Sequence, residues 1–132
     1  MKRLTRILGL AVLLTGVSLF QSCEPSAQYA GVYPYCSLNN SCTTTQTTAT
    51  YTVEIVKWDS DATKVTIRGT GLATLTGVVS GDKLTIDSYT DNSWSTPTVF
   101  TGTGTVSENT ITLTIIATSG TTLCTYVYTG FN

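Results

Sequence analysis

Apolar and polar residues alternate with period two along most of the chain, and this alternation predicts β-strands. In "TITLTI" (110–115), Ile111, Leu113 and Ile115 fall on one face and three threonines fall on the other. Strands with one apolar and one polar face are typical of antiparallel sheets that have one side in water. We therefore expect strands over residues 29–35, 51–58, 64–68, 72–79, 83–87, 100–106, 110–115 and 123–128.

Turn residues fill the breaks between the expected strands, as in Ser80-Gly81-Asp82 and Ser107-Glu108-Asn109. Short links between successive strands favour hairpins. The one longer expected connection runs from Asp87 to Pro97. Eight sequential strands leave no free edge when they close into an up-and-down barrel. The sequence thus predicts an all-β, antiparallel, eight-stranded up-and-down barrel over residues 29–132. An immunoglobulin-like β-sandwich is the alternative, which the short links disfavour because Greek-key crossovers are longer.

The apolar phase of the strands predicts which side chains point into the barrel. These are Val53, Ile55, Val65, Ile67, Leu75, Leu84, Ile86, Phe100, Ile111, Leu113 and Ile115. Gly102 and Gly104 share this inner phase, so they either permit the strand to bend or leave space for a ligand beside Phe100. Trp94 lies in the longest connection and is expected either as a lid over one barrel end or as an exposed contact for a ligand or partner.

The N-terminal segment has the pattern of an export signal. Lys2, Arg3 and Arg6 precede an uncharged, largely apolar run from Ile7 to Phe20. A basic segment followed by a short apolar one is typical of secretory signals. This run is shorter than the roughly 20 residues of a membrane-spanning helix. We expect residues 1–22 to be a signal peptide.

The border of this segment, "LFQSCEPS" (19–26), resembles the lipobox of bacterial lipoproteins, in which a cysteine follows a small residue. Ser22 fits the position before Cys23, whereas Phe20 and Gln21 depart from the strict motif. The resemblance implies acylation of Cys23 and cleavage just before it. An ordinary secretory signal with a structural Cys23 is the alternative.

Lipidation of Cys23 implies a protein anchored to a membrane of the bacterial cell envelope, which we expect to be the outer membrane. Residues 23–28 would form the lipidated tether. The run "GDKLTI…VFTGTGTVSENTITLTI…LCTYVYTGF" resembles small lipocalin-like lipoproteins of bacteria. This resemblance covers about the last 50 residues and implies a fold and a location but no reaction.

Three further cysteines, Cys36, Cys42 and Cys124, are expected to be oxidised where geometry allows, because exported proteins meet an oxidising environment. The first and last strands of a closed meander are neighbours, which favours a Cys42–Cys124 bridge. Cys36–Cys124 and Cys36–Cys42 bridges remain as alternatives. Because the number of these cysteines is odd, one thiol stays without a partner among them.

Composition restricts the function. Histidine is absent, which excludes Ser-His-Asp and Cys-His catalysis. Three of the seven basic residues precede Cys23, which leaves four against eight acidic residues, so nucleic acid is not an expected partner. No cofactor or metal motif is present. We expect a non-catalytic structural or protein-interaction module with the membrane and an envelope protein as partners. The alternative is a lipocalin-like binder of a small apolar ligand, lined by Phe100, Gly102, Gly104 and Trp94.

Overall fold

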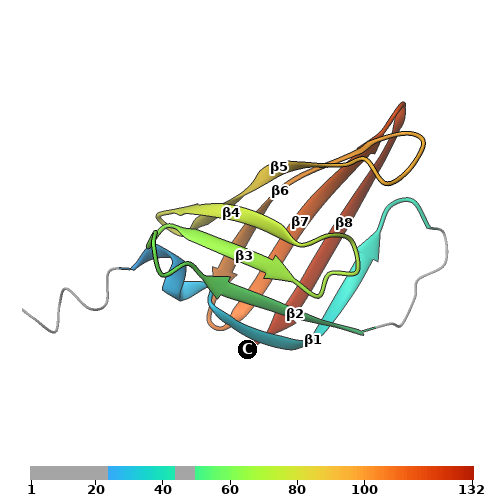
Figure 1. Ribbon diagram of the computed structural model, residues 1–132. Helices are drawn as coiled ribbons and strands as arrows, with labels where there is room; N and C mark the ends of the chain where they lie inside the picture. Colours follow the sequence, from blue (N-terminus) through green and yellow to red (C-terminus); the bar gives the residue numbers. More distant parts are fainter. Residues whose placement is uncertain (1–23, 44–49) are drawn as a thin grey trace, which may run out of the picture.

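The computed structural model describes residues 24–43 and 50–132, and its eight antiparallel strands close into one barrel in sequence order (Figure 1). The elements are a 3-10 turn η1 (Pro25–Gln28) and the strands β1 (Gly31–Asn40), β2 (Thr50–Lys57), β3 (Lys64–Arg68), β4 (Leu75–Ser80), β5 (Lys83–Asp91), β6 (Thr98–Ser107), β7 (Thr110–Ser119) and β8 (Thr122–Phe131). Each strand pairs with its sequence neighbours, and β1 pairs with β8 over Ser37–Asn40 to close the ring. The expected up-and-down barrel is confirmed, and the sandwich alternative is wrong.

The apolar residues that alternate along each strand point to the inner face of the barrel. Every residue expected to point inward is buried, and Tyr29, Tyr33 and Tyr128 add the largest fully buried side chains. The outer face of β6 and β7 carries threonines in register, as in the pairs Thr103–Thr114 and Thr105–Thr112. β-branched side chains pack well on such a half-wet pleated surface. The alternation therefore specifies both the strands and the side of the sheet that each residue takes.

Several strands run further than the alternation indicated, and two of them, β5 and β1, do so through a bulge. β5 continues to Asp91, so the first part of the expected loop from residue 87 is strand. The β5–β6 register shifts between Ile86 and Tyr89, which is the mark of a β-bulge. β1 likewise extends to Asn40 and contains a register shift, between Tyr33 and Cys36. A bulge inserts an unpaired residue and changes the phase of the side chains, so the period-two pattern breaks while the strand goes on.

One end of the barrel is closed by η1 and the tyrosine that follows it. Tyr29 is fully buried, and its hydroxyl donates to the carbonyl of Asp82 at 2.5 Å and lies 3.0 Å from that of Gly104. The backbone N–H of Ser26 donates to Ala62 in the β2–β3 hairpin at 3.1 Å. These bonds join the entering chain to two hairpins and fix it across this end, which we call the closed end.

The expected tether, residues 23–28, thus lies in part against the barrel. The side-chain amide of Gln28 donates to the carbonyl of Gly81 at 2.6 Å. Glu24 and Lys57 form an exposed salt bridge with 2.7 Å between the charged atoms. Exposed ion pairs contribute little stability, so the backbone and amide bonds hold this segment more firmly than the charges do.

Candidate interaction site

Four strands project beyond the rest of the barrel at the end opposite η1. The β4–β5 ladder stops at the pair Gly77–Ile86, whereas β5 and β6 stay paired to Asp91–Thr98 and β7 and β8 stay paired to Ser119–Thr122. In Figure 1 these strands rise away from β2, β3 and β4. We call residues 88–101 and 116–125 the extended end.

An aromatic pair lies on the inner side of the extended end. Tyr89 stacks on Phe100 with 6.4 Å between ring centroids and an interplanar angle of 27°. Phe100 is nearly buried, but Tyr89 is 44% exposed. A tyrosine with one face on an apolar ring and the other in water suits a recognition surface, because it combines apolar area with a polar group. The sequence pattern did not predict that Tyr89 points inward, because the bulge before it interrupts the period-two alternation.

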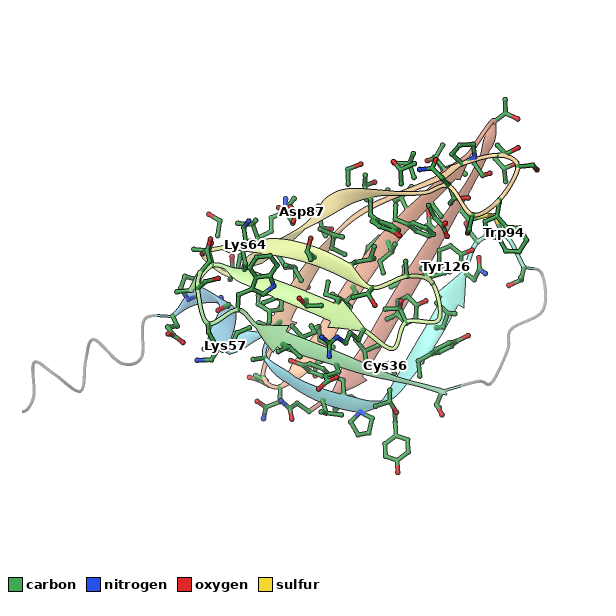
Figure 2. All side chains as sticks on the ribbon, viewed as in Figure 1. Cys36, Lys57, Lys64, Asp87, Trp94 and Tyr126 are labelled. Carbon is green, nitrogen blue, oxygen red and sulfur yellow. A yellow bond between two sulfur atoms is a disulfide. The ribbon has the colours of Figure 1, made fainter. Side chains whose placement is uncertain are left out.

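Trp94 is exposed. It lies in the β5–β6 loop with 73% of its surface in water. Figure 2 shows Trp94 at the extended end, far from Lys57 at the closed end. The expectation of a lid packed over the barrel is wrong, and the expectation of an exposed side chain is confirmed. The contact of Trp94 with a ligand or partner stays a prediction.

The two inner glycines of β6 lie where other atoms fill the available space. A Cβ atom on Gly102 would overlap the carbonyl oxygen of Thr114 on β7. A Cβ atom on Gly104 would lie 2.8 Å from Cδ2 of Leu113 and 3.1 Å from Cδ2 of Leu84. The space beside these glycines is therefore occupied by the barrel itself, so that β6 lies close to its neighbours.

The β3–β4 loop covers the interior beneath the extended end. Thr70 in this loop is buried, and its carbonyl accepts a 2.6 Å hydrogen bond from the Tyr128 hydroxyl. Tyr51 packs edge-on against Tyr128 at 5.6 Å between centroids. Burial raises the pKa of Tyr128 well above its ordinary value, so the hydroxyl stays protonated and serves as a structural donor. Neither tyrosine was singled out by the sequence, although both follow the inner phase.

The cysteines have separate roles. Cys42 and Cys124 form a disulfide with 5.3 Å between their Cα atoms, as favoured by the closed meander, and the two alternative bridges are wrong. Cys36 is a buried free thiol. Burial raises the pKa of Cys36, so the thiol is neutral at physiological pH. A buried neutral thiol is a poor nucleophile, and Cys36 behaves as a small apolar residue of the core.

Two carboxylates order short turns. Asp61 accepts bonds from the backbone N–H and the hydroxyl of Thr63, and Asp91 does the same with Ser93. These bonds lower the pKa of both Asp61 and Asp91, and the bond from the side-chain hydroxyl has the larger effect. Each carboxylate is therefore an ionised acceptor, which suits turn formation. Among residues 24–43 and 50–132, no three histidine, cysteine or acidic side chains group to hold a metal ion.

The acylation candidate Cys23 and the signal segment lie outside the described residues, which begin one position later at Glu24. No helix in the described part is long and apolar enough to cross a membrane. Comparison of the chain with family models, curated proteins and solved structures gives no match. Only the barrel fold of the suspected lipocalin-like lipoprotein is therefore shown, as an eight-stranded antiparallel up-and-down barrel.

Proposed function

We propose that this chain is a lipid-anchored protein of the bacterial cell envelope that acts as a non-catalytic protein-interaction module. The single observation that carries the proposal is the presence of two exposed aromatic residues, one of them stacked on Phe100, at the end of the barrel opposite the entering chain. Tyr89 and Trp94 lie at the extended end, whereas the chain enters the barrel at the closed end through Glu24. Acylation of Cys23 would thus hold the closed end near the membrane and direct the extended end, with Tyr89 and Trp94, away from it.

The packing of the interior favours an interaction module over a carrier of a small ligand. Tyr29, Tyr33 and Tyr128 are fully buried inside the barrel. Leucine side chains and strand backbone occupy the space beside Gly102 and Gly104, where the ligand hypothesis needs room. A small-molecule site usually offers a volume of about 300 Å³ or more, so a ligand bound inside would have to displace these groups. A partner at the extended end requires no such rearrangement.

Cross-linking in the native envelope tests this function. The double variant Tyr89→Ala/Trp94→Ala removes aromatic area from the extended end without touching the fully buried core. We expect it to lose a cross-linked partner protein that the wild type retains. Tyr35→Ala is the matched control, because Tyr35 is 76% exposed on β1, away from that end. Equal cross-linking of all three proteins would contradict the proposal, as would native mass spectrometry of the extracted protein showing a bound small molecule in place of a partner.

A further inference from the structure

Strand β5 has an unpaired backbone edge at the extended end. Its ladder with β4 stops at Ile86, while on the other side β6 remains paired with Tyr89, Thr90 and Asp91. Apart from the strand ladders, no backbone–backbone hydrogen bond in the described part of the chain involves Ser88–Asp91. An exposed edge presents free N–H and C=O groups, which form a template for another strand.

Two carboxylates flank this edge without basic partners. Asp87 accepts the Thr76 hydroxyl at 2.9 Å, and Asp91 accepts from Ser93. Figure 2 places Asp87 on β5. Within residues 24–43 and 50–132, the only salt bridge joins Lys57 to Glu24 at the closed end. The edge is therefore acidic, and within the described part of the chain no lysine or arginine forms a salt bridge with Asp87 or Asp91.

We propose that the β5 edge from Ser88 to Asp91 binds an extended segment of a partner protein as an added strand, with lysine or arginine at both ends of the segment and an apolar residue between them. This inference rests on the proposed interaction function and names the chemistry of the partner. Backbone hydrogen bonds supply affinity in strand addition, and side-chain contacts supply specificity. The bulge before Tyr89 leaves Asp87 on the outer face of the sheet and places Asp91 on the inner face with Tyr89. The two cations of the segment therefore lie on opposite faces, one beside each carboxylate, and its apolar residue packs on the inner face near Tyr89.

The same charges disfavour a second copy of this chain as the occupant. Pairing two β5 edges would bring the carboxylates of one copy next to those of the other. Like charges in neighbouring strands are destabilising, and charged residues on edge strands are a common protection against self-association. Asp87 and Asp91 therefore repel the same edge of a second copy and attract a strand that carries basic residues. Repulsion and attraction both contribute to selectivity.

The probe is the acetylated and amidated peptide KTVK, whose two lysines point to opposite faces of an extended strand, with ETVE as its charge-reversed counterpart. Both are titrated into the full chain, isotopically labelled and purified in detergent micelles, and amide chemical shifts are followed by NMR. We expect KTVK to shift the amides of residues 88–91 and ETVE to leave them unchanged. A version of KTVK methylated at alternate amide nitrogens should bind at least about tenfold more weakly, because it loses backbone hydrogen bonds.

The variant Asp87→Asn/Asp91→Asn isolates the charge. Asparagine keeps an oxygen that accepts the bonds from Thr76 and Ser93, so the local turns are retained. We expect KTVK to bind this variant about fivefold to tenfold more weakly, with less dependence on salt, as suits two exposed ion pairs. The Asp59→Asn variant carries its change in the β2–β3 turn at the closed end and should bind like the wild type.

Three results would overturn the inference: equal binding of KTVK and ETVE, equal binding of the methylated peptide, or shifts confined to other parts of the barrel. If the cross-linked partner depends on Tyr89 and Trp94 but KTVK fails to bind the edge, strand addition is wrong and the interaction function stands. If no cross-linked partner depends on those aromatic residues, the proposed function fails whatever the peptide does.

Discussion

Gly102 and Gly104 are close in sequence and share the inner phase of β6, but different atoms face them. Gly102 faces the backbone of β7, which cannot move without opening the barrel wall. Gly104 faces the ends of two leucine side chains, which can rotate. A side chain is therefore excluded at Gly102 by the sheet itself, and at Gly104 only by the packing of the core.

This difference gives an ordered stability prediction. Gly102→Ala should lower the free energy of unfolding by about 1–3 kcal/mol or more, because overpacking forces the backbone to shift. Gly104→Ala should cost less, since Leu84 and Leu113 can adjust. Urea denaturation of both variants measures the effect. A larger loss for Gly104→Ala than for Gly102→Ala would contradict the explanation.

At the scale of elements, the pattern of residues predicted strands well wherever the period of two was unbroken. β1 and β5 continue past their expected ends through a bulge, whereas β7 and β8 extend to Ser119 and Phe131 with unbroken pairing. The exposed edge of β5 depends on how far β4 reaches, which is a tertiary property that no local pattern records. The exposure of Tyr89 could not be predicted for the same reason, because it depends on where the neighbouring strand stops. For Trp94 the sequence left a lid and an exposed side chain as alternatives.

The register of β7 can be tested by truncating neighbouring side chains. Leu113 is fully buried and Thr112 lies on the outer face of the sheet. Leu113→Ala should cost about 2–5 kcal/mol through lost packing and the cavity left behind. Thr112→Ala should stay within about 0.5 kcal/mol of the wild type. Equal losses in urea denaturation would mean that the register is wrong, since a one-residue slip exchanges the two faces.

For the whole molecule, closure of the barrel joins the first strand to the last. The β1–β8 ladder is short and covers only Ser37–Asn40 on β1. The disulfide between Cys42 and Cys124 continues this junction toward the extended end and spans 82 positions of sequence. The sequence favoured this bridge because a meander places its terminal strands side by side, although it could not exclude the bridges to Cys36.

Removal of the disulfide should therefore destabilise the barrel as a whole. Cys42→Ser/Cys124→Ser should lower the free energy of unfolding by about 4 kcal/mol on the chain-entropy model, because a long loop is released in the unfolded state. Chemical reduction of the wild type should give a similar loss in urea denaturation. Cys36→Ala is the control that keeps the bridge. A double variant as stable as the wild type would contradict a structural role for the bridge.

The two ends of the barrel differ, and the proposed anchor determines which of them lies near the membrane. If Cys23 is acylated, Cys23→Ser should move the protein from the membrane fraction to the soluble fraction or leave the signal segment uncut. Each buried CH₂ group contributes about 0.8 kcal/mol, so several acyl chains bind durably and their loss is decisive. Cys36→Ala removes a different thiol and should remain in the membrane fraction. A Cys23→Ser protein that stays in the membrane with a processed N-terminus would show that the barrel is held there by something other than a lipid on this residue.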